Sequence, residues 1–208
     1  MDFELTAEQK EIRRVAREFG KAEIAPLAAR YDESHEFPHE IIEKLGDLGF
    51  MGALFPPEYG GAGLDYVSYA LVVEELSRAD GSVGITMWAH NSLCANHIYL
   101  FGSEAQKRKY LVPLARGEAL GAWGLTEPGS GSDAAAMKTR AVRDGDHFVL
   151  TGTKAFITNG GVGRRAVVMA VTDPTKGPKG ISAFILEKGM PGFSVGQRYR
   201  KLGLHASD

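Results

Sequence analysis

The pattern of apolar residues changes near Gly121, and this change most constrains how the chain can fold. Before it, apolar side chains recur at helical spacing, beginning after a capping box formed by Thr6 and Gln9. After it, short β-rich runs alternate with Gly/Pro loops, and no helical period outlasts one turn. We therefore predict an α+β protein, with an all-α helical domain over residues 1–119 and a small antiparallel β-barrel or sheet domain over residues 120–208.

Local signals indicate where helices of the first region begin. Pro38 suits the first turn of a helix, Asp65 suits an N-cap, and Ser103 with Gln106 repeats the capping-box spacing. Pro26 is expected to lie just beyond the first helix, because proline disrupts a helix interior. The first region therefore predicts several helices joined by loops.

The second region contains several segments with strand character. Asp144-Gly145 lies between two β-rich runs and predicts a hairpin. Residues 165–173 and 181–188 are also rich in β-forming side chains, whereas residues 192–200 carry a weaker signal. Thr153–Gly161 is expected to end a strand and to run into an Asn-Gly turn.

Residues 82–101 contain no Asp, Glu, Lys or Arg, which raises the question of a membrane span. The segment also holds several polar side chains, including those of His90, Asn91, Asn96 and His97. Such groups are costly in lipid, so we expect a helix buried within protein, with some polar groups facing a cavity, and no membrane span.

Composition and charge argue against several classes of protein. The formal net charge of −2 provides no basic field for nucleic acid. A single cysteine, Cys94, gives no intrachain disulfide, and the six histidines show no metal-binding spacing. Gly60, Gly61 and Gly63 follow no strand, so the fingerprint of a nicotinamide enzyme is missing. The N-terminus lacks a signal-peptide pattern, and we expect a cytoplasmic protein.

The segment Gly124–Asp133, GLTEPGSGSD, concentrates small donors and flexible backbone between regions that look well packed. Gly129 and Gly131 permit close approach of the backbone to a ligand. Thr126, Ser130 and Ser132 offer hydroxyl groups, and the surrounding amides can point at acceptor atoms. This chemistry suits a flat, heteroatom-rich ligand with phosphates, although the same residues also suit an ordinary surface loop.

The segment Thr153–Gly161, TKAFITNGG, is a second candidate for ligand binding. The aromatic ring of Phe156 lies close in sequence to the hydroxyl of Thr158, a pairing that suits stacking on a ring and a hydrogen bond to one of its nitrogens. A strand that ends in a turn is the structural alternative. Two such segments beside a buried uncharged helix indicate a shared pocket.

These motifs resemble those of the acyl-CoA dehydrogenase family. GLTEPGSGSDAAA resembles the family's fingerprint along its whole length, and KAFITNGG resembles its second flavin-contacting segment. LTAEQKEIRRVAREF, PPEYGGAG and KLGLHASD also lie where the family has similar runs, so the resemblance covers essentially all of the chain. It implies a helical N-terminal domain, a β middle domain and a C-terminal helical bundle. Because the chain ends at Asp208, we expect a fragment that lacks the bundle.

The resemblance implies FAD as the cofactor and names the residues that would hold it. By position, the implied flavin-contacting residues are Trp123, Gly124, Leu125, Thr126, Gly131, Ser132, Phe156, Ile157 and Thr158. Thr126 would hydrogen-bond the pyrimidine side of the isoalloxazine ring, and Thr158 would lie near its reactive nitrogen. Many relatives have tryptophan where this chain has Phe156, which keeps the packing but loses the indole donor.

The resemblance also implies an acyl-CoA substrate. Ser132 would contact the pantetheine arm of the thioester as well as the flavin. Ile85, Trp88 and Ala89 would line the acyl-chain pocket, although core packing explains these three residues equally well.

The reaction of the family is an α,β-desaturation, in which a carboxylate removes the α proton while a hydride leaves the β carbon. The resemblance puts this base in the C-terminal bundle, so we expect no catalytic residue in this chain. Glu127 is expected to form an ion pair or a hydrogen bond within its loop. Glu74 and Glu75 are expected to form a solvated face or to pair with Arg78.

The family implies further partners and leaves two alternatives open. Members are usually homotetramers that pass electrons to an electron-transfer flavoprotein, so we expect a homo-oligomer. An acyl-CoA oxidase would instead pass electrons to oxygen. A non-catalytic flavin-binding fragment is the second alternative, because the domain that bears the base is missing. Each alternative predicts a flavin site in the same two segments.

Overall fold

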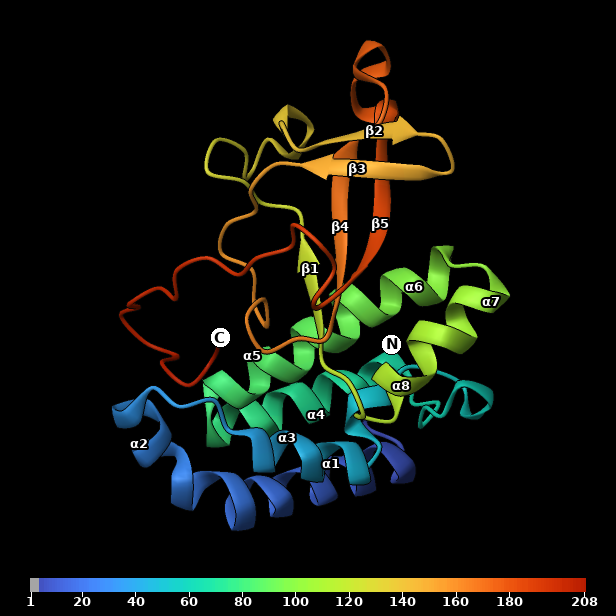
Figure 1. Ribbon diagram of the computed structural model, residues 1–208. Helices are drawn as coiled ribbons and strands as arrows, with labels where there is room; N and C mark the ends of the chain where they lie inside the picture. Colours follow the sequence, from blue (N-terminus) through green and yellow to red (C-terminus); the bar gives the residue numbers. More distant parts are fainter. Residues whose placement is uncertain (1–3) are drawn as a thin grey trace.

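The computed structural model describes residues 4–208, with a helical layer at one end and a β-sheet at the other (Figure 1). The first residues of the acidic amphipathic start, Met1 to Phe3, lie outside this range. The polypeptide crosses from the helices to the sheet between Ala115 and Gly121. The helical region followed by a sheet region confirms the α+β prediction in this coarse form.

The helical layer begins with α1 (Ala7–Phe19), whose capping box is formed by Thr6 and Gln9 as predicted. The remaining helices are α2 (Ala25–Ser34), α3 (His39–Asp47), α4 (Tyr66–Ala79), α5 (Gly81–Ala89), α6 (Asn96–Phe101), α7 (Glu104–Gln106) and α8 (Val112–Ala115). Asp65 caps α4, Ser103 and Gln106 form the second capping box, and Pro38 precedes α3. Short local signals therefore predicted the starts of α1, α3, α4 and α7.

The course of the polypeptide around Pro26 differs from the sequence prediction. Pro26 does not lie beyond the first helix, because α1 continues through a π-helical stretch, Gly20–Ile24, directly into α2. Pro26 is the second residue of α2, which directly follows this π-helical stretch. A second π-helical stretch, His90–Ala95, joins α5 to α6 into one long rod.

None of the helices in residues 4–208 combines the length and the apolarity that crossing a membrane requires.

Helices α1 and α4 are held together by Glu75, a charged side chain that the sequence did not place in the core. Its carboxylate is completely buried and accepts hydrogen bonds from Arg13 (Nε, 2.8 Å) and Arg17 (Nε 2.9 Å and Nη2 2.7 Å) of α1. The predicted pairing with Arg78 is present as well, at 3.5 Å. The expectation of a solvated face is therefore correct for Glu74, which is exposed, and wrong for Glu75.

The sheet is mixed and open, which corrects the prediction of an antiparallel barrel. Its strands are β1 (Gly121–Gly124), β2 (Arg140–Asp144), β3 (His147–Thr151), β4 (Arg165–Val171) and β5 (Ile181–Glu187). Strands β2 and β3 form the predicted hairpin, and β4 pairs with β5 in antiparallel fashion. Strand β4 also pairs in parallel with β1 and, through one residue pair, with β2. Residues 153–161 and 192–200, predicted to have strand character, contribute no strand.

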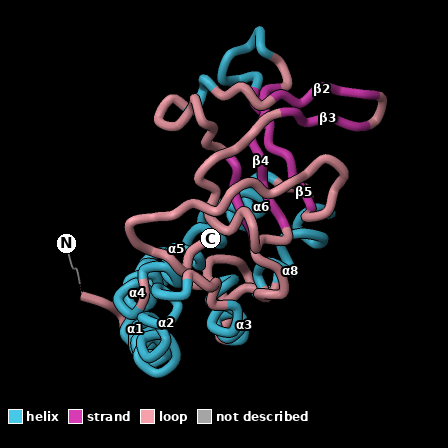
Figure 2. Tube along the Cα trace, turned by 60° about the vertical axis from the view of Figure 1, so that its left-hand side comes forward, coloured by secondary structure: helices cyan, strands magenta, loops and turns pink. Residues whose placement is uncertain are grey.

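Figure 1 shows β1 rising from the long α5–α6 rod into the sheet, so this strand links the two layers. The segment after β5 returns from the sheet to the helices, a course that the tube in Figure 2 also follows. At its end His205 pairs with Asp32 of α2 (Nδ1 to Oδ1, 3.0 Å) and stacks on His35. The two layers are thus joined both at β1 and near residue 205.

Candidate functional site

The first candidate segment continues β1 away from the helical layer. Within β1, the side chain of Trp123 packs against the helical core on the same side as Val167, while Ala122 belongs to the cluster on the other face of the sheet. The indole N–H of Trp123 is buried, with no hydrogen-bond partner among residues 4–208. After Gly124 the backbone leaves the sheet and enters the glycine-rich loop.

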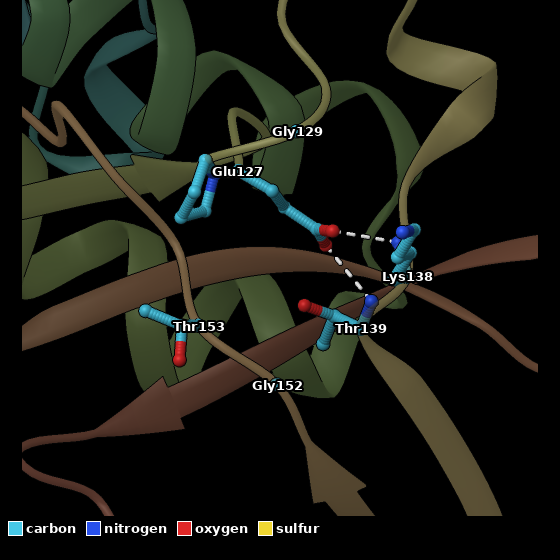
Figure 3. A pocket seen from close by; sticks show the side chains of 7 residues that line it. Glu127, Gly129, Lys138, Thr139, Gly152 and Thr153 are labelled. Atoms are coloured by element: carbon cyan, nitrogen blue, oxygen red, sulfur yellow. Dashed lines mark hydrogen bonds between the residues drawn. The ribbon is translucent and has the colours of Figure 1, made fainter.

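Glu127 anchors this loop at its base. Its carboxylate accepts hydrogen bonds from the backbone N–H groups of Lys138 (2.6 Å) and Thr139 (2.9 Å), which follow the loop in sequence (Figure 3). Paired backbone bonds also close the loop between Glu127 and Ser130. Residues 127–139 are therefore held at both ends, and the glycine-rich part between them projects outward.

Lys154 ties the second candidate segment to the first. Its ammonium donates to Glu127 Oε1 (2.8 Å) and to the carbonyl oxygen of Leu125 (3.0 Å). The next residue, Ala155, donates its backbone N–H to the carbonyl oxygen of Thr126 at 2.9 Å. The two segments, far apart in sequence, therefore run side by side over these residues.

The buried ion pair has a clear electrostatic consequence. Burial raises the pKa of Glu127, but the Lys154 ammonium and the two backbone donors outweigh it and lower that pKa to about 2. Glu127 is therefore ionised and fully engaged at neutral pH. It forms both the ion pair and the loop hydrogen bonds expected from the sequence.

Phe156 has an unusual backbone conformation for an aromatic residue. Its φ angle is +58°, and the residue is 71% exposed. A bulky residue in the left-handed region is strained, and such strain concentrates at binding sites. The ring stacks on Tyr199 at 4.8 Å between centroids, which leaves an aromatic surface beside the joined segments.

Three hydroxyl groups of the candidate set are uncommitted. Within residues 4–208, the side chains of Thr126, Ser132 and Thr158 have no protein hydrogen-bond partner. By contrast, the Ser130 hydroxyl donates to the carbonyl oxygen of Asp133 at 2.8 Å and belongs to the loop itself. The Ser130 hydroxyl is therefore part of the loop structure, whereas the hydroxyls of Thr126, Ser132 and Thr158 remain available to a ligand.

The other candidate residues differ in what their side chains do. Ile157 packs against the sheet cluster of Ala122 and Val168, so its side chain serves the core. Leu125 is half-buried, and Gly124 lies against the Lys154 side chain, where an added Cβ would come within 3.2 Å of Lys154 Cγ. Gly131 is exposed, with open space around it.

The candidate acyl-pocket residues lie on α5. Ala89 is buried, Ile85 is half-buried, and Trp88 is 38% exposed. One turn of this helix contacts the second candidate segment, because the Thr86 carbonyl oxygen accepts a hydrogen bond from the side chain of Asn159 at 3.2 Å. The helix is thus attached to the segment that contains Phe156 and Thr158.

A hollow of about 300 Å³ lies at the loop base (Figure 3). It is lined by Glu127, Pro128, Gly129, Lys138, Thr139, Gly152 and Thr153. Its lining excludes the aromatic and hydroxyl groups described above, so it is distinct from the surface that Phe156 and Thr126 border.

Within the described part of the chain, no three His, Cys, Asp or Glu side chains gather as metal ligands would. The buried ring of His90 is held by backbone groups. Its Nδ1 accepts the backbone N–H of Gly121 (2.9 Å), and its Nε2 faces the carbonyl oxygens of Met51 and Leu114 (3.1 Å each). Complete burial lowers the pKa of His90 to about 4, so the ring is neutral.

Sequence reasoning missed two residues that organise the site. Lys154 and Asn159 both lie inside the second motif, yet their partners lie 27 to 73 positions away in sequence. A lysine or an asparagine in a loop is ordinarily solvated, so their identity alone gave no signal. Only the fold brings their partners within reach.

Comparisons with known proteins agree with this arrangement. The family profile "Acyl-CoA dehydrogenase, N-terminal domain" matches residues 6–118, and "Acyl-CoA dehydrogenase, middle domain" matches residues 122–208. The short-chain-specific acyl-CoA dehydrogenase of Clostridium acetobutylicum is 55% identical over all of this chain and 55% of its own length.

Two solved structures share the fold. The butyryl-CoA dehydrogenase of Megasphaera elsdenii is 47% identical with a TM-score of 0.95, and the match covers 100% of this chain and 55% of that one. A chain from work on the electron transferring flavoprotein of Acidaminococcus fermentans is 52% identical with a TM-score of 0.97, at the same coverage.

The helical layer, the open mixed sheet and the two joined loops occur in a chain whose two halves match two acyl-CoA dehydrogenase domain profiles. This chain belongs to the acyl-CoA dehydrogenase family, whose members are FAD-dependent oxidoreductases. It spans about half of the length of the curated relatives it matches, 55% for the Clostridium enzyme.

Proposed function

We propose that this chain supplies the flavin-binding and thioester-binding part of an acyl-CoA dehydrogenase. The whole protein would desaturate an acyl-CoA thioester of short, medium or branched chain. The observation that carries the proposal is the joining of the two candidate segments through Lys154 and the Thr126–Ala155 hydrogen bond. The similarity to short-chain-specific and butyryl-CoA dehydrogenases supports the substrate class.

The chemistry of the residues present fits FAD. Phe156 offers an exposed ring to a flat ligand, and the hydroxyls of Thr126 and Thr158 are uncommitted on the two joined segments. The buried, unpartnered indole N–H of Trp123 lies in the same stretch of chain. We therefore assign FAD binding to the nine residues named from the sequence, with Trp123, Gly124 and Ile157 contributing mainly backbone or packing.

FAD, when bound, supplies the two-electron acceptor of the reaction. The chain's own residues have different tasks. Thr126 and Thr158 would orient the ring system by hydrogen bonds, and Phe156 would cover part of it and exclude water. Ser132, exposed beside Gly131, would hold the pantetheine arm, while Ile85, Trp88 and Ala89 of α5 would border the acyl chain.

No residue is assigned as the base. Glu127, the carboxylate between the two segments, is held by Lys154 and by backbone donors, and its pKa of about 2 makes it a poor proton acceptor. We propose that the base comes from outside residues 4–208, as the family resemblance implies. We also keep residues 1–119 and 120–208 as the two domains of this part of the protein.

The proposed partners follow from the same comparisons. The likeness to a chain studied with the electron transferring flavoprotein of Acidaminococcus fermentans supports an electron-transfer flavoprotein as acceptor. We propose a homo-oligomeric assembly and a cytoplasmic location for the whole protein. An acyl-CoA oxidase is the second candidate function, because the flavin segments described here are common to both chemistries.

Visible absorption tests the flavin site. The whole protein is expected to be isolated yellow, and anaerobic butyryl-CoA is expected to bleach it by reducing the flavin. Thr158→Ala should shift the flavin band or weaken FAD binding, since it removes a hydroxyl from the proposed ring contact. Thr153→Ala is the matched control, because that exposed threonine lines the separate hollow. A colourless protein that ignores added FAD would refute the proposal.

The same sample separates dehydrogenase from oxidase. After anaerobic bleaching, air is admitted and the return of the yellow colour is timed. Slow reoxidation that accelerates when an electron-transfer flavoprotein is added supports the dehydrogenase. Immediate reoxidation by oxygen alone supports the oxidase.

A further inference from the structure

Asn159 stands where three parts of the molecule meet. Its side chain is completely buried, and its amide group donates to two backbone carbonyl oxygens, those of Gly121 (3.1 Å) and Thr86 (3.2 Å). Gly121 is the first residue of β1, and Thr86 lies in the middle of α5. One side chain therefore links the second candidate segment to the strand that leads into the first segment and to the acyl-pocket helix.

Both backbone polar groups of Gly121 are hydrogen-bonded to side chains. His90 accepts its N–H at 2.9 Å, and Asn159 donates to its carbonyl oxygen at 3.1 Å. There is no room for a side chain, because a Cβ at this position would lie 2.7 Å from the sulfur of Cys94. These hydrogen bonds and close contacts therefore hold the start of β1 against the α5–α6 rod.

The backbone of Asn159 is specialised as well. Its φ angle is +66°, in the left-handed region that asparagine tolerates better than most other residues. Its N–H donates to the Asp208 carbonyl oxygen (3.0 Å), and its carbonyl oxygen accepts from Gly163 (2.7 Å). A turn of this kind needs a residue that accepts positive φ and also carries a donor pair, and asparagine meets both requirements.

The groups that Asn159 connects have different proposed tasks. Thr86 is flanked on α5 by Ile85 and lies one turn before Ala89, both assigned to the acyl chain. Gly121 lies five positions before Thr126, and Asn159 itself directly follows Thr158, both assigned to the flavin ring. Desaturation requires the acyl chain and the flavin to be aligned to within about 1 Å.

We infer that Asn159 is a positioning residue that sets the register between the acyl-pocket helix and the flavin-contacting segments. This inference rests on the proposed function. Asn159 touches neither reactant; it acts through the carbonyl groups of Thr86 and Gly121. Its removal is therefore expected to impair alignment of the reactants more than binding of either one.

The chain contains a matched control in Asn91. This side chain is also completely buried, and it also donates to two backbone carbonyl oxygens, those of Phe50 (3.0 Å) and Met87 (3.2 Å). Its amide oxygen, like that of Asn159, has no partner among the described residues. Both hydrogen bonds of Asn91 stay within the helical layer. Asn91 is therefore a buried asparagine with the same number of hydrogen bonds as Asn159, but it does not connect the helices to the sheet.

The test compares Asn159→Asp with Asn91→Asp in the whole FAD-loaded protein. Each change keeps the shape of the side chain. It replaces the amide group that donates to two carbonyl oxygens with a carboxylate oxygen, which only accepts hydrogen bonds. Stopped-flow reduction by butyryl-CoA is expected to slow about 10- to 100-fold in Asn159→Asp at saturating thioester, with the half-saturating concentration changed less than about 3-fold. Asn91→Asp is expected to retain the wild-type rate within about 3-fold at a temperature where both variants are folded.

A second readout is independent of turnover. The backbone amides of a peptide covering Gly121–Thr126 are expected to lose protection from hydrogen exchange in Asn159→Asp and to stay protected in Asn91→Asp.

If the aspartate variant does not fold, Asn159→Gly keeps the positive φ and removes the side-chain amide, with Asn91→Gly as its control. Equal reduction rates and equal protection in the matched variants would overturn the inference. A wild-type flavin that butyryl-CoA does not reduce would instead count against the proposed function, and hydrogen exchange would still decide the role of Asn159.

Discussion

Two buried glutamates, one in each layer, show how the same side chain serves different purposes. Glu75 in α4 meets arginines of α1 and of its own helix, and Glu127 at the base of the glycine-rich loop meets Lys154 and backbone donors. Arginines lower the carboxyl pKa of Glu75 to about 2, and Lys154 together with hydrogen bonds from Lys138 and Thr139 lowers that of Glu127 to about 2, although burial acts in the opposite direction in both cases. Glu75 joins two helices, whereas Glu127 organises a loop.

The partners of the two carboxylates differ in their access to water. The side chains of Arg13, Arg17 and Arg78 are 35%, 41% and 61% exposed, whereas that of Lys154 is only 11% exposed. A guanidinium that loses Glu75 can be solvated where it stands. An ammonium that loses Glu127 remains shielded, and two backbone N–H groups lose their acceptor with it. The cost of a buried charge therefore depends on its partners as much as on its own burial.

The largest expected effect is that of Glu127→Gln. The substitution leaves the Lys154 ammonium without a counter-charge. It also places an amide group where the carboxylate accepted from backbone N–H groups. Together these changes are expected to lower the free energy of unfolding by about 3–5 kcal/mol. Urea denaturation at pH 7 measures this cost. In the double variant Glu127→Gln/Lys154→Met the cost should be smaller than the sum of the single costs, because the uncompensated charge is gone. A loss below about 1 kcal/mol would contradict the comparison with Glu75.

The second effect is a pH dependence that originates between the two layers, at His90. Burial lowers its folded-state pKa to about 4, against about 6.5 when unfolded, so protonation favours the unfolded chain. Stability is fully present above pH 6.5 and is lost as pH falls toward 4. Between pH 6.5 and 4.5 the loss is expected to be about 2–3 kcal/mol.

Denaturation curves across this pH range test the assignment to His90. A His90→Gln variant should start less stable and show a flatter dependence over the same range. Both glutamates keep their charge there, because their stabilising contribution is lost only as pH falls below about 4.5 toward 2. An equally steep loss in His90→Gln would show that another group titrates.

The third effect, that of Glu75→Gln, is expected to be smaller than the first. The amide oxygen of glutamine still accepts from an arginine of α1, and the partly exposed guanidinium groups recover solvation. We expect a loss of about 1–2 kcal/mol, measured by the same urea titration. A loss as large as that of Glu127→Gln would mean that partner exposure does not set the cost.

The sequence predicted what short-range chemistry decides. The two capping boxes, the N-cap at Asp65 and the β2–β3 hairpin depend on residues within a few positions of one another, and the structure confirms them. The two motifs GLTEPGSGSD and KAFITNGG also identified the family correctly, because a long mixed motif is specific even without a structure.

What the sequence did not predict depends on partners distant in the chain. The parallel pairing of β1 with β4 joins residues more than 40 positions apart, so the antiparallel barrel was a wrong extrapolation from local strand signals. Glu75 is buried because Arg13 and Arg17 approach from α1. The strand expected to lead into Phe156 is absent, since this residue takes a positive φ angle instead of an extended one.

The smallest expected effect belongs to Glu74, the neighbour of Glu75 in sequence. Its carboxylate pairs with Arg78 at 3.0 Å, but both side chains are about half exposed or more, at 49% and 61%. Water and salt screen such a pair, so Glu74→Ala should change the unfolding free energy by no more than about 0.5 kcal/mol. Thermal unfolding in low and high salt measures this, with Glu75→Gln alongside. If Glu74→Ala were as costly as Glu75→Gln, the general charge balance of α4, rather than the burial of one carboxylate, would hold α1 against it.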